Sequence, residues 1–552
     1  MNAVGGKGRL ATRVHDLWWC LVAAVFTFAA FPTALAPDYS FWPLIWVSHI
    51  PLLWILKDKS PKQAFMWGLL CGTLINAGGY YWIASMLETF GQLPLPLALV
   101  GLALHSVQLG LIWALWAWLM NRVGNTTSMP IEWSAPIIMV AVEFMMPRIF
   151  PAYMGNSQYL FLPIMQIADL FGVTAITFLI YRVNAVLYLW LRSWLEGRSR
   201  PVKATWVTIA MMVLTCTYGL YRIYAVDAIS ASSTKLTVGI VEGDVGIFQE
   251  ETQEKRRNHL LIQQRLSARL EAEGVDLIVW PESAYRRKIL PRRAKKMGVS
   301  DRPLVDDYRQ DRATPEFDRS APIRGFRTPL LFGGTSFEKS DAPRWEGDGL
   351  MTPRNSAFLL DRDGRVLDVY DKVYLLVFGE YVPFAKYIPF IYQWIPAAGD
   401  LEAGTRIKAL TADVWDKGPI RLGVLVCYEA ILPAFVRRFI PERPNIFVNL
   451  TNDDWFGKTA ERYLHFLLTI PRAIEHRTPV VRATLTGVSG FVDPVGRVVK
   501  ETKMTGAETL SWSVPVMQSQ TVYQIVGDVF PWSCVGVTLF TFGWGRVRRW
   551  RG

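Results

Sequence analysis

The sequence is poor in cysteine, and the positions of its few cysteines argue against a disulfide framework. Its 552 residues contain five cysteines. Four of them lie within apolar stretches, where cysteine behaves as a small hydrophobic residue: Cys20, Cys71, Cys216 and Cys534. No paired spacing typical of a metal site is present. The fifth, Cys427, lies in a region of mixed composition and is a candidate nucleophile, although a buried core thiol is the alternative.

The chain also lacks internal repeats, low-complexity tracts and the basic pattern of a nucleic-acid groove. Its net charge is +12, but many of its positive residues flank apolar stretches, which is typical of membrane proteins. The composition is 51% hydrophobic and 13% aromatic, with 23 Trp. This excess is concentrated in the first two fifths and the last thirty residues. The length and the uneven composition predict a membrane protein of at least two units, with no nucleic-acid partner.

Eight stretches are long and apolar enough to cross a hydrocarbon layer of about 30 Å. They are 17–36, 39–56, 63–87, 94–120, 130–147, 163–191, 204–224 and 525–545. The first lacks a convincing cleavage site and further spans follow it, so it is not a signal peptide. The positive-inside rule places both termini in the cytoplasm.

These spans divide the chain into three parts. We expect a membrane domain of seven helices over 1–225, an outer domain over 226–518, and a final helix with a cytoplasmic tail over 519–552. In a Gram-negative bacterium, the protein would lie in the inner membrane with its outer domain in the periplasm.

Four residues of the predicted spans stand out. Glu143 and Arg182 would be costly against lipid, so we expect both inside the bundle. Pairing with a neighbour is favoured over lining a path for lipid. Gly78 and Gly79 interrupt the third span, and close helix packing explains them as well as function does.

Residues 226–515 alternate short apolar runs with charged stretches, as in a layered α/β domain. Predicted strands are 236–241, 277–280, 330–332, 357–360, 366–370, 422–426, 446–450, 480–483 and 491–499, and predicted helices are 250–273 and 460–477. Asp361–Gly364 and Asp493–Gly496 are predicted turns. The basic stretch 285–327 fits poorly, and either meets anionic lipid headgroups or is a solvated insertion.

Three polar residues stand at the ends of apolar runs, where α/β folds place active groups: Glu282, Lys372 and Cys427. A thiol attacks as thiolate, and an adjacent base can generate it. A buried glutamate with a raised pKa can be that base. A lysine can stabilise the oxyanion of an acyl-transfer intermediate. Each residue alone is more often structural.

The segments around these residues resemble the nitrilase superfamily, which uses a Glu-Lys-Cys triad on an α-β-β-α sandwich. The matching segments, in the same order and approximate spacing, are Trp280-Pro281-Glu282, Tyr370-Asp371-Lys372 and Val426-Cys427-Tyr428-Glu429. Further segments narrow the resemblance to the bacterial apolipoprotein N-acyltransferases, over nearly the whole chain. They are Phe378–Pro383, Thr451–Gly457, Phe90–Pro94, Gly155–Gln158 and Gln166–Asp169.

This resemblance implies a two-step acyl transfer. Cys427 would take an acyl chain from a phospholipid, typically phosphatidylethanolamine, and hold it as a thioester. The amine of a diacylglyceryl-modified N-terminal cysteine of an apolipoprotein would then accept it. Glu282 would be general base and acid, and Lys372 would stabilise the oxyanion with a backbone N–H near Tyr428. The remaining matches are a supporting carboxylate and residues near the pocket: Glu380, Tyr428, Glu429 and Trp455.

The sequence departs from the family pattern at several places. Glu242 and Asp244 replace an amide pair, Val377 stands for a proline, Leu485 for an amide, and the basic insertion 285–327 is long. These departures leave two alternatives open: a divergent enzyme that acylates another amine, and an amidase that uses water. A non-catalytic lipid-binding protein is a third, which the intact triad disfavours. No cofactor or metal is implied, and a monomer is the default.

Overall fold

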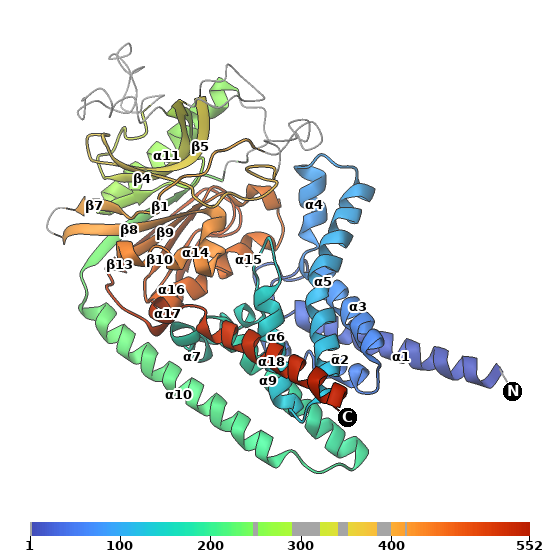
Figure 1. Ribbon diagram of the computed structural model, residues 1–552. Coiled ribbons are helices and arrows are strands. Elements are labelled where there is room, and N and C mark those ends of the chain that lie inside the picture. The colour runs from blue at the N-terminus through green and yellow to red at the C-terminus, as the bar shows by residue number, and fades with distance from the viewer. Residues whose placement is uncertain are drawn as a thin grey trace. The chain divides into compact units, whose positions relative to one another are not determined.

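The protein is described from a computed structural model, covering residues 3–244, 246, 252–289, 321–339, 351–383, 399–414 and 417–551. The chain forms two compact units (Figure 1). One consists of residues 1–224, 459–464 and 521–552, and the other of residues 225–458 and 465–520. The first is helical and is called the membrane unit below, and the second is the α/β unit.

The membrane unit is built from helices of very different lengths. They are α1 (Ala3–Phe28), η1 (Trp42–Trp46), α2 (Ile50–Leu56), α3 (Pro61–Gly79), α4 (Trp82–Thr89), α5 (Leu95–Thr126), α6 (Ile131–Met145), η2 (Met154–Gln158), α7 (Leu162–Met165), α8 (Ala168–Phe171), α9 (Thr174–Glu196), α10 (Val202–Ser232), α17 (Val522–Val526) and α18 (Val529–Arg551). Among the described residues, α5, α9 and α10 are long and apolar enough to cross a membrane. The predicted stretch 163–191 is interrupted, because α8 ends at Gly172 with φ +72° before α9 begins.

Helices α3 and α5 approach each other closely through glycines. A Cβ atom on Gly72 would lie 2.8 Å from the carbonyl oxygen of Gly110, and one on Gly68 would lie 2.4 Å from that of Trp113. Only glycine lets two backbones approach this closely, a device common in membrane helices.

Both charged residues that were expected to avoid lipid are buried. Glu143 is 1% exposed and Arg182 is fully buried. Glu143 Oε1 accepts a hydrogen bond from Met154 N at 2.7 Å. Arg182 donates to the Glu132 carbonyl at 2.9 Å and lies 4.0 Å over the Trp133 ring. Both residues therefore lie inside the bundle, as expected, and each has a neighbouring partner.

The α/β unit contains two sheets. Its strands are β1 (Lys235–Glu242), β2 (Leu277–Val279), β3 (Tyr285–Ile289), β4 (Leu330–Lys339), β5 (Met351–Leu360), β6 (Val366–Asp371), β7 (Leu410–Val414), β8 (Gly418–Val426), β9 (Ile446–Thr451), β10 (Val480–Thr484), β11 (Gly490–Val492), β12 (Val498–Glu501) and β13 (Glu508–Pro515). The first sheet has the order β13-β1-β2-β4-β5-β6, with β3 beside β4, and the second has the order β12-β11-β10-β9-β8-β7.

Helices cover these sheets. The described helices of the α/β unit are α11 (Gln253–Ala272), α14 (Pro433–Arg437), α15 (Glu461–Leu467) and α16 (Ile470–His476), and its short turns include η5 (Cys427–Ile431), η6 (Ile440–Glu442) and η7 (Asp453–Phe456). Leu260 and Leu270 of α11 share a buried core with Ile278 and Phe332 of the first sheet. Helix α16 packs beside β10 of the second sheet. Helix α15 is divided between the two units, because its residues 461–464 group with the membrane unit and the rest with the α/β unit.

Among the described residues, every predicted strand is present, with 491–499 forming the two strands β11 and β12 around the predicted turn, and three further strands were not predicted. The unpredicted strands are β3, β7 and β13. β3 lies in the basic stretch that fitted poorly, and residues 290–320 of that stretch lie outside the described residues. The predicted helix 460–477 is two helices, because Pro471 begins a new helix at its N-terminal turn.

Candidate active site

Three strand ends carry the predicted triad. Glu282 follows β2 after Trp280 and Pro281, Lys372 directly follows β6, and Cys427 directly follows β8. Gly333 of β4 lets the backbone of Glu282 lie against the sheet, because a Cβ atom there would be 2.5 Å from Glu282 Cα. All three side chains are buried, with exposed fractions of 6% for Glu282, 1% for Lys372 and 8% for Cys427.

The Lys372 ammonium lies between two carboxylates. Its Nζ is 2.7 Å from Glu380 Oε2 and 3.8 Å from Glu282 Oε1. The Asn355 amide donates to both acids, at 2.5 Å to Glu282 Oε1 and 2.9 Å to Glu380 Oε1. Glu380 Oε2 also accepts from Leu376 N at 2.8 Å. Glu380 therefore holds Lys372 in place, while Glu282 keeps an oxygen, Oε2, without a hydrogen-bond partner among the described residues.

Cys427 stands at a sharp turn between strand and helix. Its φ is +52°, a region that non-glycine residues seldom occupy and that is often found at functional sites. The Thr451 hydroxyl lowers the pKa of the thiol and so favours its ionised form, against the effect of burial. Its carbonyl oxygen accepts from Asn449 Nδ2 at 3.3 Å. Strand β9 thus fixes both the backbone and the side chain of Cys427 from the neighbouring position in the sheet.

Burial and charge set the protonation of the site. Burial raises the pKa of Glu282 to about 7, although the Lys372 charge opposes this rise. Burial raises the pKa of the Cys427 thiol to about 12, and the Glu282 charge adds to the rise while Lys372 opposes it. Burial would lower the pKa of Lys372, but the charges of Glu380 and Glu282 raise it above its ordinary value. At neutral pH the site therefore holds a charged lysine, a neutral thiol and a glutamate able to gain or lose a proton.

Glu429 ties two of the strand ends together. Its Oε1 accepts from the backbone N–H groups of Val373 at 2.7 Å and Tyr374 at 3.0 Å, just after Lys372. Its Oε2 accepts from Val426 N at 2.8 Å, just before Cys427. The Tyr370 hydroxyl donates to both oxygens at 3.0 Å. Burial raises the pKa of Glu429 to about 7.

A buried network supports the Cys427 turn from behind. Arg482 donates to Asn449 Oδ1 at 2.5 Å and to Asp453 Oδ2 at 2.6 Å. His465 Nδ1 lies 2.7 Å from Asp453 Oδ1. Burial opposes ionisation of Asp453, but the Arg482 and His465 charges hold its pKa below the ordinary value. The chain of contacts runs from Arg482 through Asn449 to the backbone of Cys427.

The remaining predicted residues lie near these groups in different ways. Tyr428 is 6% exposed, and its ring lies 5.8 Å from that of Tyr374. Trp455 is half-buried in η7, after β9. Asn355 was not predicted as a site residue, although the pairing of β5 with β6 places it opposite Lys372. Ser356 pairs with Asp371, so the preceding residue of β5 faces Lys372, and Lys372 N donates to Asn355 O at 2.8 Å.

The departures from the family pattern occupy defined positions. Glu242 ends β1 and is fully buried, accepting from the Ser489 hydroxyl at 2.6 Å and the Thr502 hydroxyl at 2.7 Å. Asp244 has φ +45° and accepts from Gly506 N at 2.7 Å. Val377 forms a bridge with Tyr381, and Leu485 is fully buried.

The fold and the site define a nitrilase-like carbon–nitrogen hydrolase unit joined to a helical membrane unit. Comparison with known families agrees with this class. The apolipoprotein N-acyltransferase N-terminal domain matches residues 23–186, and the carbon–nitrogen hydrolase family matches residues 324–523.

Comparison with individual proteins narrows the class. The apolipoprotein N-acyltransferase of Geobacter metallireducens is 32% identical over 94% of this chain and 93% of its own. That of Bdellovibrio bacteriovorus is 27% identical over 89% of this chain and 86% of its own. The solved amidase of Nesterenkonia sp. AN1 is 19% identical, covers 51% of this chain and 93% of its own, and has a TM-score of 0.33. The chain belongs to the apolipoprotein N-acyltransferase family, as its sequence motifs predicted.

Proposed function

We propose that this protein transfers an acyl chain from a phospholipid to the N-terminal amine of a diacylglyceryl-cysteine apolipoprotein, through a thioester on Cys427. The observation that carries the proposal is the buried group of Glu282, Lys372 and Cys427, in which Lys372 lies 3.8 Å from Glu282. Phosphatidylethanolamine is the expected donor. The relatives named above carry the same activity in their names.

In the first step, the Cys427 sulfur attacks the ester carbonyl of the phospholipid. Its proton passes to Glu282, whose pKa of about 7 suits a base at neutral pH. The carbonyl oxygen becomes an oxyanion, which Lys372 and a backbone N–H near Tyr428 stabilise. The tetrahedral intermediate then collapses. Its ester C–O bond breaks, and the lysophospholipid leaves with the proton from Glu282.

In the second step, the amine of the apolipoprotein cysteine attacks the thioester carbonyl. Glu282 takes a proton from the amine as the new C–N bond forms. The C–S bond breaks, and the Cys427 sulfur regains the proton from Glu282. The enzyme returns to its starting state, and the two substrates react in turn in a ping-pong sequence.

Around this chemistry we assign supporting roles. Glu380 holds the Lys372 ammonium, with which it makes the shorter of the two ion pairs at 2.7 Å. Glu429 fixes the loops that carry Lys372 and Cys427, and Tyr428 and Trp455 flank the substrate. Lipid substrates suit a membrane enzyme, because both donor and acceptor are held in the bilayer.

For the chain as a whole we propose eight membrane spans in a bacterial inner membrane. Both termini would lie in the cytoplasm, the 226–518 domain in the periplasm, and the protein would be a monomer. Labelling of single cysteines introduced at Lys59 and at Ser513, in intact cells with a membrane-impermeant maleimide, tests the topology. Only the second position should react.

Intact mass spectrometry tests the mechanism. The purified protein is incubated with phosphatidylethanolamine beside its Cys427→Ala variant, and the expected result is a hydroxylamine-labile gain of one acyl chain in the wild type alone. A folded wild type without an adduct from several phospholipids would refute the thioester. Release of free fatty acid in place of transfer to a diacylglyceryl-cysteine peptide would favour the amidase alternative.

A further inference from the structure

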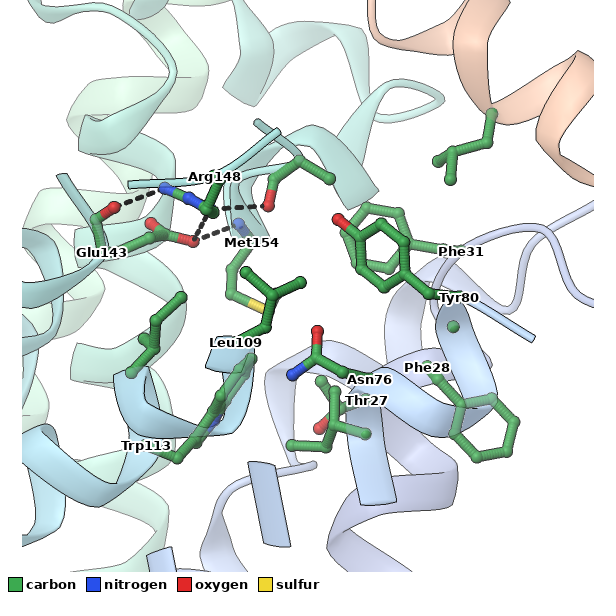
Figure 2. A pocket seen from close by; sticks show the side chains of 15 residues that line it. Thr27, Phe28, Phe31, Asn76, Tyr80, Leu109, Trp113, Glu143, Arg148 and Met154 are labelled. Carbon is green, nitrogen blue, oxygen red and sulfur yellow. Dashed lines mark hydrogen bonds and ion pairs between the residues drawn. The ribbon is translucent and has the colours of Figure 1, made fainter. Parts of the chain in front are cut away.

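A partly open cavity lies inside the membrane unit (Figure 2). Its volume is about 50 Å³, and it is lined by residues of α1, α3, α5 and α6, by Leu464 of α15, and by residues that follow α1, α3 and α6. Much of the wall is aromatic or aliphatic, including Phe28, Phe31, Tyr80, Leu109, Trp113 and Met154. None of the triad residues lines the cavity.

The polar side chains of the wall mostly face partners of their own. Thr27 donates to Ala23 O at 2.7 Å, Asn76 to Gly72 O at 2.7 Å, and Tyr80 to Phe150 O at 3.2 Å. Each of these contacts turns a donor toward the backbone. The donors of the wall are therefore engaged before any ligand arrives.

The two charges of the wall offset each other. Arg148 Nη1 lies 3.9 Å from Glu143 Oε1 and donates to Ala152 O at 2.9 Å. Figure 2 shows the guanidinium between the Glu143 carboxylate and the loop. The other carboxylate oxygen, Glu143 Oε2, has no hydrogen-bond partner by distance among the described residues. A wall with balanced charge favours neither a phosphate nor an ammonium group, and its apolar surface favours hydrocarbon.

Two adjacent glycines of α3 differ in their surroundings, because Gly78 is tightly packed and Gly79 faces open space. A Cβ atom on Gly78 would strike the Phe28 ring at 2.4 Å, so that glycine is required for packing. A Cβ atom on Gly79 would meet only Phe28 Cβ, at 3.9 Å. Gly79 lines the cavity, so its missing side chain leaves room that packing does not need.

We infer that this cavity binds the end of a phospholipid acyl chain, which enters beside Gly79. The cavity holds roughly four groups the size of a water molecule, which suits the last few carbons of a chain. Gly79, Phe28 and Phe31 are only partly buried, so the cavity reaches the surface of the membrane unit there. In a bilayer, the medium at that surface is itself hydrocarbon. This binding does not depend on the proposed acyl transfer.

Photo-crosslinking tests the inference on the full-length protein in phospholipid vesicles. The probe is a phosphatidylethanolamine with a diazirine at the end of one acyl chain, and peptide mapping locates the adduct. Gly79→Leu fills the cavity. Gly124→Leu is the matched control, because a Cβ atom on Gly124 of α5 would meet nothing within 4 Å, and Gly124 does not line the cavity.

The wild type and Gly124→Leu should crosslink at Phe28, Phe31 or Trp113, and Gly79→Leu should lose at least fivefold of that signal. Ile112→Phe fills the cavity from α5 and provides a second variant should Gly79→Leu not fold. Unchanged crosslinking in folded filled variants, or labelling in the wild type no stronger than at exposed Leu104, would overturn the inference.

The same measurement in the Cys427→Ala background separates this site from the transfer chemistry. Crosslinking there should equal that of the wild type, whatever becomes of the thioester. A raised KM for phospholipid in Gly79→Leu, at unchanged kcat, would identify the chain as that of the donor. An unchanged KM with lost crosslinking would identify it as that of a resident lipid, and both results support the cavity as an acyl-chain site.

Discussion

Replacing Glu242 with glutamine should stabilise the α/β unit increasingly as the pH rises. Glu242 is fully buried at the end of β1, and its Oε2 accepts from the Ser489 and Thr502 hydroxyls. Its Oε1 has no partner among the described residues. Burial raises the pKa of this acid to about 8, so that the folded protein holds its proton at neutral pH.

The sign of the effect follows from proton linkage. Between the ordinary pKa of 4.5 and the folded pKa of about 8, the folded state binds the proton and the unfolded state has lost it. The free energy of unfolding therefore falls as the pH rises through this window. The full difference corresponds to roughly 5 kcal/mol at 1.36 kcal/mol per pKa unit, an upper bound because a buried site relaxes. About 2–4 kcal/mol is a realistic range.

Glutamine removes this dependence while keeping the contacts. Its carbonyl oxygen can accept from both hydroxyls, and its neutral amide resembles the protonated acid in size. The variant and the wild type should therefore match near pH 5 and diverge toward pH 8.5. For a unit of this size, the divergence corresponds to roughly 5–10 °C in Tm.

Thermal unfolding of detergent-solubilised protein, followed by tryptophan fluorescence across this pH range, measures the divergence. Glu508→Gln is the control, since Glu508 pairs directly with Glu242 across β1 and β13 but is only partly buried. Parallel Tm profiles for Glu242→Gln and the wild type would refute the reasoning. The Asp244 charge adds to the rise in the pKa of Glu242.

Four further outcomes are expected. The rate of Cys427 acylation, measured by stopped flow, should rise with pH and level off above about 7, as Glu282 loses its proton. The Glu282→Gln variant should not show this rise. Asn355→Ala should lower kcat about tenfold or more with little change in Tm, measured by acyl transfer, because both acids lose a shared donor. Glu429→Gln should reduce activity and leave the thioester rate, measured by mass, strongly impaired. Arg482→Met should cost about 3–5 kcal/mol in chemical denaturation because it breaks the buried ion pair at Asp453 Oδ2 and leaves only the contacts of Oδ1, whereas Arg482→Lys should recover part of this loss.

The sequence predicted the strands that carry the triad because each ends where an apolar run gives way to polar residues. The apolar runs before Glu282, Lys372 and Cys427 are short, β-branched or aliphatic, and bounded by polar residues. Tertiary packing adds β3, β7 and β13, which carry charged or polar residues along much of their length. Their pairing in the sheets, rather than their own composition, makes them strands.

The supporting network could not be read from the sequence for a different reason. Asn449 lies on β9, Asp453 in the turn η7 that follows it, and Arg482 on the neighbouring strand β10. Their contacts depend on the order of strands in the second sheet, where β9 lies between β8 and β10. Periodicity shows that a strand is buried, but not which neighbour its polar residue meets.

Two buried glutamates with similar acidity differ in the geometry around them, and this difference supports the proposed assignment of Glu282 as the base and Glu429 as a structural acid. Burial raises the pKa of both Glu282 and Glu429 to about 7, so acidity alone does not distinguish them. Both oxygens of Glu429 accept hydrogen bonds, from Tyr370 and from backbone N–H groups on the two loops that it joins. Protonation there would break contacts that hold the site together. Glu282 Oε2 accepts no hydrogen bond by distance among the described residues, so a proton there would leave the bond from Asn355 to Oε1 in place, and the side chain interacts with the Cys427 thiol. The acid with an open oxygen is the one that can act as the base, and the acid with saturated oxygens keeps the base, the lysine and the thiol in register.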